Sequence, residues 1–203
     1  MKIVYSHLLN LLEQQPKLKE LSDLLFQLGH EHEIDGEVLD IEITPNRGDC
    51  LSLKGLARDL NYFYQAKELP KSDMTLPALE LQFDNKAQDV CPNISFMQIE
   101  IEQVPTKYEP YLEAYFADLG INKNNFFTDI SNYLAYESGQ PTHCFDQSAM
   151  QGHFSLAKKN LNTKFKTLLD TEIELTGENL VFSLDDEVIS LAGTMGGAST
   201  ACS

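Results

Sequence analysis

The apolar residues of this chain repeat at helical spacing in some segments and at strand spacing in others, which restricts it to a mixed α and β fold. Between residues 18 and 28, leucines recur after three, four and three positions, the spacing of one helix face, and Gly29 then favours a stop. Residues 37–44 instead alternate between polar and apolar, which indicates a half-buried strand. Pro45 ends that strand, because proline cannot donate a ladder hydrogen bond. The sequence therefore predicts the α+β class.

Two units are predicted, separated by a polar segment. Residues 1–70 form a small N-terminal module of helices and a strand, including a helix over residues 50–65 that Asp49 caps. Residues 71–87 are the predicted linker, since the stretch around their start contains prolines and lacks periodicity. Residues 88–203 form the second, mixed α/β unit. Hydrophobic residues make up 42% of the chain, so a packed core is expected.

The second unit is predicted to contain both kinds of element. A strand over residues 94–104 precedes helices over residues 110–120 and 127–139, and the first of these helices has clear helical spacing of its apolar residues. Short β-prone segments then follow to the end of the chain. The sequence LDDE at residues 184–187 is typical of a hairpin turn between two of them.

The net charge limits the functions that the chain can perform alone. Fifteen Lys and Arg against 31 Asp and Glu give a formal charge of −16. Binding of nucleic acid through its phosphates needs clustered Lys and Arg, so this chain should repel a polyanion at long range. No apolar run approaches the roughly 20 residues that span a bilayer, and the N-terminus lacks the apolar block of a secretory signal. We therefore expect a cytoplasmic location, which also fits four scattered cysteines, Cys50, Cys91, Cys144 and Cys202.

The stretch SGQPTHCFDQ, residues 138–147, contains the strongest candidate for chemistry. His143 follows a break at Gly139 in a loop where a side chain can face a cleft; the alternative is a structural histidine bonded to backbone. Cys144 is its direct neighbour and so points elsewhere, which favours packing over nucleophilic catalysis. Asp146 could orient the histidine or cap a short helix, and capping is the favoured role.

Three other features have weaker functional signals. His30 and His32 form an H-x-H among acidic residues, but no third well-spaced ligand is evident, so no metal site is expected. Arg47 is expected to pair with Asp49 and hold its loop. The glycine-rich residues 192–199 lack the spacing of a phosphate-binding motif; they either line a pocket for a small group or permit a bend.

Taken together, three strings resemble the beta subunit of bacterial phenylalanyl-tRNA synthetase. They are DIEITPNR at 40–47, GQPTHCFD at 139–146 and AGTMGGAS at 192–199, and their order and spacing agree across nearly the whole chain. The resemblance implies an N-terminal module followed by an editing module, which hydrolyses tyrosine wrongly attached to phenylalanine tRNA. It implies that His143 is catalytic and that the substrate is bound by Ser131, Asn132, Gln140, Pro141, Ala192, Gly193, Gly196 and Gly197.

The same resemblance implies the partners. They are the 3′ end of phenylalanine tRNA carrying tyrosine and, in the full enzyme, the alpha subunit. No cofactor, metal or membrane is expected for this chain, since ATP and magnesium would belong to the synthetic site of the full enzyme. The residue types suit the chemistry, because ester hydrolysis needs a positioned water and donors for the developing oxyanion.

The sequence also departs from the pattern of that family. Only residues 31–37 stand where some members carry a tRNA-binding oligonucleotide-fold insertion, and the sequence stops before the strand that bears a pocket glutamate. Residues 122–130 lack the usual Arg-Pro, so that Asn124 or Asn125 would replace the family asparagine. We therefore expect a shortened module that does not synthesise aminoacyl-tRNA by itself. The alternatives are a structural or tRNA-binding module that has lost hydrolysis, and a small-ligand-binding protein.

Overall fold

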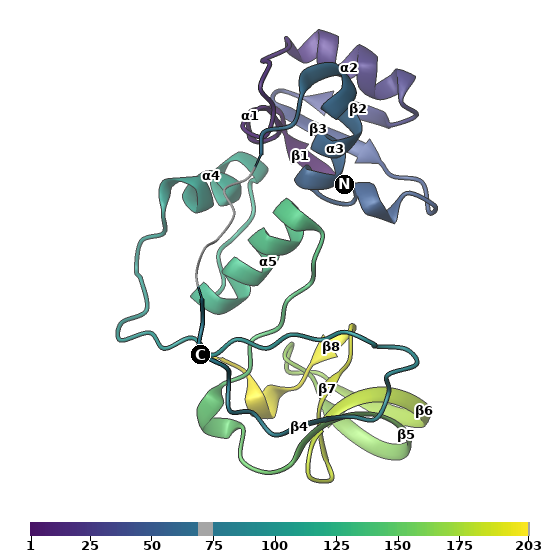
Figure 1. Ribbon diagram of the computed structural model, residues 1–203, viewed down its shortest axis with the longest axis vertical. Helices are drawn as coiled ribbons and strands as arrows, with labels where there is room; N and C mark the ends of the chain where they lie inside the picture. The colour runs from purple at the N-terminus through teal and green to yellow at the C-terminus, as the bar shows by residue number, and fades with distance from the viewer. Residues whose placement is uncertain (69–74, 203) are drawn as a thin grey trace. The chain divides into compact units, whose positions relative to one another are not determined.

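The chain packs as two compact units, each formed by two separate stretches of sequence. A computed structural model describes residues 1–68 and 75–202 (Figure 1). The first unit comprises Met1–Asp73 and Val104–Thr142, and the second comprises Met74–Gln103 and His143–Ser203. Both helices and strands are present, which confirms the predicted α+β class. None of the helices in the described ranges is long and apolar enough to cross a membrane.

The first unit begins with a three-stranded antiparallel sheet in the order β1-β3-β2. Its strands are β1 (Lys2–Val4), β2 (Glu31–Asp35) and β3 (Val38–Glu42), and the helices of this part are α1 (Tyr5–Leu9), α2 (Leu18–Gln27) and α3 (Leu53–Tyr64). The predicted helix over 18–28 and strand over 37–44 are confirmed by α2 and β3. The strands β1 and β2 were not predicted, because β1 is short and β2 buries only His32, which leaves no apolar alternation to detect.

Ser52, rather than Asp49, caps the helix α3. The Ser52 hydroxyl accepts a hydrogen bond from the Gly55 N–H at 3.0 Å. Asp49 lies in the preceding 3₁₀ turn η1 (Gly48–Cys50), where its carboxylate pairs with Arg47 and Arg58. The predicted cap was wrong because the chain makes this extra turn before the helix starts, and the turn brings the arginines to the carboxylate.

Two further helices, α4 (Pro110–Leu119) and α5 (Phe126–Ser138), also pack within the first unit. They confirm the two predicted helices. Tyr136 of α5 accepts a hydrogen bond from the Val4 N–H at 3.2 Å, and the apolar core around it includes residues of α4. The compact units therefore divide the chain differently from the predicted boundaries of 1–70, 71–87 and 88–203. Those boundaries stay a prediction about sequence domains, and residues 71–74 lie outside the described residues.

The second unit is built on a five-stranded sheet in the order β4-β5-β6-β7-β8. The β4–β5 pair is parallel and the other pairs are antiparallel. The strands are β4 (Phe83–Asn85), β5 (Phe154–Lys166), β6 (Glu172–Leu184), β7 (Glu187–Leu191) and β8 (Met195–Gly196). Several short β-prone segments thus merge into the two long strands β5 and β6. The predicted turn over 184–187 is confirmed, with Asp185 at a φ of +49°.

The segment 94–104 is not a strand, contrary to the prediction, and β4 lies inside the predicted linker 71–87. Both errors arise from one aromatic cluster. Phe83 of β4 lies 4.8 Å from Phe96 and 5.0 Å from Phe154 between ring centroids. One aromatic side chain therefore anchors each segment to the sheet, whereas the alternate residues of 94–104, such as Ile99, remain exposed.

Candidate functional site

His143 and Gly196 lie against each other in the second unit. A methyl group built on Gly196 would lie only 2.4 Å from Cε1 and 3.0 Å from Nε2 of the His143 imidazole. The ring also meets Phe145 edge-on, with centroids 4.5 Å apart. The absence of a side chain at position 196 therefore makes room for the imidazole. Of the residues predicted for the site, this structure brings these two into direct contact.

The surroundings of His143 favour its neutral form. The residue is exposed to solvent, yet the protein atoms packed around its ring lower the pKa of His143 below the ordinary value of 6.5, because desolvation disfavours the charged imidazolium. Within the described residues, neither ring nitrogen has a hydrogen-bond partner. At neutral pH the ring therefore has one nitrogen that can accept a proton and one that can donate a hydrogen bond.

The glycine-rich segment forms a tight turn followed by a closely packed strand. Gly193 has a φ of +72° in the turn between β7 and β8, a conformation that favours glycine. A methyl group on Gly197 would lie 2.4 Å from the Ile189 carbonyl oxygen, to which the Gly197 N–H donates at 2.9 Å. These glycines thus permit a bend and a close backbone approach, one of the two roles considered from the sequence. Ala192, half-buried in the same turn, precedes Gly193.

The remaining predicted site residues belong to the first unit. Ser131 and Asn132 are on α5, where Ser131 is half-buried and Asn132 is exposed. Gln140 and Pro141 are exposed in the loop that follows, and the Gln140 N–H donates to the Ser138 hydroxyl at 3.2 Å. Their predicted contact with substrate stays a prediction.

Asp146 caps a short helix, as predicted. Its Oδ1 accepts from the backbone N–H of Ser148 at 2.8 Å and from the Ser148 hydroxyl at 2.7 Å, at the start of the 3₁₀ turn η2 (Gln147–Ala149). These two hydrogen bonds hold the pKa of Asp146 below its ordinary value. The carboxylate is therefore engaged with its own turn rather than with the His143 ring.

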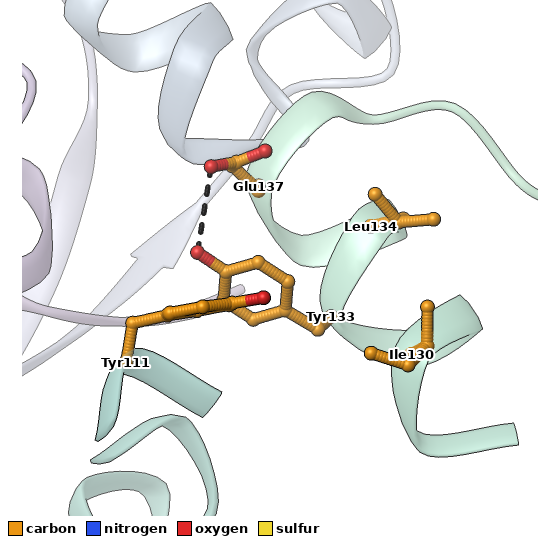
Figure 2. A pocket seen from close by; sticks show the side chains of 5 residues that line it. All are labelled: Tyr111, Ile130, Tyr133, Leu134 and Glu137. Atoms are coloured by element: carbon orange, nitrogen blue, oxygen red, sulfur yellow. Dashed lines mark hydrogen bonds between the residues drawn. The ribbon is translucent and has the colours of Figure 1, made fainter. Parts of the chain in front are cut away.

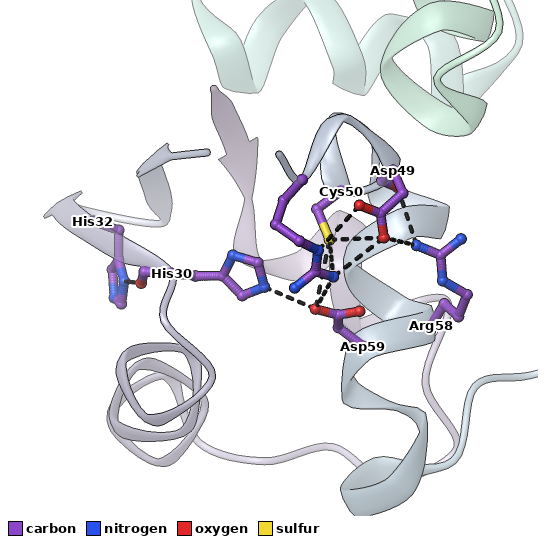
Figure 3. A network of polar contacts seen from close by, with 7 residues as sticks. His30, His32, Asp49, Cys50, Arg58 and Asp59 are labelled. Atoms are coloured by element: carbon purple, nitrogen blue, oxygen red, sulfur yellow. Dashed lines mark hydrogen bonds and ion pairs between the residues drawn. The ribbon is translucent and has the colours of Figure 1, made fainter. Parts of the chain in front are cut away.

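A second polar cluster, in the first unit, is an ion-pair network centred on Asp59 (Figure 3). Its carboxylate contacts Arg47 Nη2 at 2.6 Å and His30 Nε2 at 3.0 Å. Arg47 also donates from Nε to Asp49 at 3.0 Å, which confirms the predicted pair, and from Nη2 to the sulfur of Cys50. Burial alone would raise the pKa of Asp59, but hydrogen bonds from Arg47 and His30 lower it.

The Arg47 guanidinium lies where a metal ion would bind to this cluster. His30, Cys50 and Asp59 offer ligand atoms within 4.8 Å of one another, a spacing that could hold a metal ion. However, the guanidinium of Arg47 already places a cation against two of the three. Burial, with the Asp59 charge, raises the pKa of Cys50 to about 11, so the sulfur is a thiol rather than a thiolate ligand. The arrangement is that of a structural network.

His32 does not share the ligand set of His30. Its ring bonds to the Ser22 hydroxyl and to the His30 carbonyl oxygen, both at 2.9 Å. The H-x-H pattern in the sequence therefore did not predict that His30 pairs with Asp59. Asp59 was missed because it lies far along the sequence, and only the fold brings it to Arg47.

Comparison with known proteins places the chain in a family. Residues 98–203, more than half of the chain, match the B3/4 domain family. The chain belongs to the B3/4 domain family. The matched segment includes α4 and α5 as well as the strands that carry the glycine-rich turn, so the B3/4 region contains every predicted site residue.

Two known proteins that are similar to the chain have the same name. The chain is 30% identical over 172 residues to a protein of Psychrobacter arcticus named phenylalanine–tRNA ligase beta subunit. The aligned region covers 81% of this chain and 21% of that relative. A protein of Thermotoga maritima with the same name is 34% identical over 172 residues. That aligned region covers 82% of this chain and 22% of the relative. The chain thus spans about a fifth of the length of these relatives.

A solved structure is also similar. It is an N-terminal fragment of the phenylalanyl-tRNA synthetase beta-subunit from Pyrococcus horikoshii, with 15% identity and a TM-score of 0.49. The similarity covers 100% of this chain and 64% of that one.

Proposed function

We propose that this chain is an editing module of the phenylalanine–tRNA ligase beta type, which hydrolyses tyrosine wrongly attached to phenylalanine tRNA. The observation that carries the proposal is the packing of a neutral His143 on Gly196, inside a segment of the B3/4 domain family. The names of the curated relatives give the class of substrate. As a B3/4 module it would not form aminoacyl-tRNA, which needs a separate synthetic site with ATP and magnesium.

The proposed chemistry is addition of water to the ester carbonyl that joins tyrosine to the tRNA. A neutral imidazole can accept a proton from the attacking water or hold it by a hydrogen bond, and His143 is in that form at neutral pH. Backbone N–H groups are suitable donors for the oxyanion that develops. We assign Ser131 and Asn132, with Gln140 and Pro141, to binding of the substrate, and the turn at Ala192 and Gly193 to the fit of its side chain.

Selection of tyrosine over phenylalanine would rest on one hydroxyl. A pocket that hydrogen-bonds the phenol rejects phenylalanine strongly, because its own buried polar groups are then left without a partner. Attraction of the tRNA would come from elsewhere in an assembly with the alpha subunit, since the net charge of this chain is −16.

The alternative is a binding module that retains the fold without hydrolysis. The acidic charge favours it, because a chain that repels the tRNA at long range turns over substrate slowly by itself.

A deacylation assay separates the two. The chain is mixed with phenylalanine tRNA carrying labelled tyrosine, and release of tyrosine is compared with buffer, with His143→Ala and with His153→Ala. His153 is a matched control, because it is an exposed histidine of the same unit. The editing proposal expects release that His143→Ala reduces at least about tenfold and His153→Ala leaves unchanged. Release at the buffer rate would support the binding module. Equal release by all three proteins above the buffer rate would instead exclude the role assigned to His143.

A further inference from the structure

A pocket of about 330 Å³ lies in the first unit, between one face of α5 and the start of α4. It is lined by Tyr111, Ile130, Tyr133, Leu134 and Glu137 (Figure 2). The four α5 residues are spaced as i, i+3, i+4 and i+7, so they form one stripe along the helix. The volume is at the lower end of known ligand sites and is large enough for one long side chain.

The walls of the pocket are aromatic and aliphatic. The rings of Tyr111 and Tyr133 have centroids 5.2 Å apart and are tilted by 54°. Tyr111 is 54% exposed, so its ring is available to a partner. Ile130 and Leu134 supply aliphatic surface further along the stripe, as Figure 2 shows. Such walls take the methylene stem of a long side chain and a flat group laid against the rings.

The polar end of the pocket is a carboxylate with spare acceptor capacity. Glu137 Oε2 pairs with Lys54 Nζ at 2.9 Å. Among the residues that the structure describes, Oε1 receives only a long 3.4 Å bond from the Tyr133 hydroxyl. Burial, and then the Glu137 charge, raise the pKa of Tyr133, so its ring stays a neutral phenol. The Lys54–Glu137 pair is partly buried. Since an ionised carboxylate has about four acceptor positions, a second cation can share it through Oε1.

We propose that this pocket binds an arginine side chain of a partner polypeptide. The guanidinium lies over the tyrosine rings and donates to Glu137, and the stem packs on Ile130 and Leu134. Aromatic faces attract cations, and the planar, weakly hydrated guanidinium stacks on them better than an ammonium does. The net charge of −16 favours a basic partner as well. The inference does not rest on the editing proposal.

The test uses the whole chain and a blocked tripeptide, acetyl-Ala-Arg-Ala-amide, with two analogues in which citrulline or lysine replaces arginine. Binding is followed by NMR of the Ile130 and Leu134 methyl groups. Citrulline keeps the shape of arginine without its charge. We expect saturable shifts with the arginine peptide and at least about threefold weaker binding of both analogues. Shifts that do not saturate, or equal binding of the citrulline or the lysine peptide, would overturn the assignment.

Three variants locate the binding. Tyr111→Ala and Glu137→Gln should each weaken binding of the arginine peptide at least about threefold while the rest of the spectrum is preserved. Tyr62→Ala is the matched control, because Tyr62 is an 88% exposed tyrosine on α3 of the same unit. Equal weakening by Tyr62→Ala, or none by both pocket variants, would contradict the proposed site.

Discussion

Replacing Gly196 with alanine places a methyl group where the His143 imidazole now lies. The new carbon would be 2.4 Å from His143 Cε1 and 2.5 Å from Leu168 Cδ1, closer than side-chain carbons approach in proteins. The backbone of Gly196 has no positive φ, so the cost is steric. Leu168 is 42% exposed and can move aside, and the imidazole must move as well. We therefore expect about 1 kcal/mol of destabilisation, the lower end for an overpacked site.

The larger expected effect of Gly196→Ala is on editing. A displacement of a catalytic group by about 1 Å can cost on the order of a hundredfold in rate. Tyrosine release, measured with labelled tyrosyl-tRNA, should therefore fall at least about tenfold, and the His143 Cε1 proton resonance should shift. Stability is measured in parallel by urea unfolding.

Gly177→Ala is the matched control for this experiment. Gly177 is at the same sheet's β5–β6 ladder with a φ of +70°, and a methyl group there would meet nothing within 4 Å. It should lose about 1 kcal/mol through backbone strain alone and retain tyrosine release. If Gly196→Ala retains both the wild-type rate and the His143 resonance, the reasoning about this contact is refuted.

Three further predictions concern pH and the first unit. Because the pKa of His143 is lowered, tyrosine release should rise with pH through a midpoint below 6.5 and then level off; a midpoint above 6.5 would contradict this. The free energy of unfolding should fall as pH drops from 6.5 through that lower value, since the unfolded chain binds the proton first, and His143→Gln should remove this loss. Asp59→Asn should cost about 2 kcal/mol in urea unfolding by leaving Arg47 and His30 without their shared carboxylate, whereas Asp23→Asn, in an exposed pair, should change little. Ser52→Ala should cost about 1 kcal/mol through loss of the α3 cap, and an unchanged unfolding midpoint would reject that cap.

The sequence predicted the elements with strong periodicity and missed those without it. The helix α2 and the strand β3 follow from spacing alone. The strand β4 is three residues long and is held by the aromatic contacts of Phe83, which no local pattern shows. The opposite error occurred over residues 94–104, where the alternation of apolar residues predicted a strand. Phe96 packs on Phe154 of the sheet, but residues of the opposite face, such as Ile99, are exposed. Tertiary packing decided both cases.

The local parts of the site were predictable, and the contacts across the sequence were not. Capping by Asp146 and the Arg47–Asp49 pair join residues two apart, so short-range chemistry identified them. The contact of His143 with Gly196 depends on how the loop is placed on β8, and the bond from His30 to Asp59 depends on the packing of α3. Neither has a signal in the spacing of the residues.

The most direct test of the editing account is the selectivity of hydrolysis. The chain is given phenylalanine tRNA charged either with tyrosine or with phenylalanine, and release of each amino acid is followed under single-turnover conditions. The account predicts that tyrosine is released at least about tenfold faster than phenylalanine and that His143→Ala abolishes the difference. Equal release of the two amino acids by the wild-type chain, or a difference that persists in His143→Ala, would contradict it.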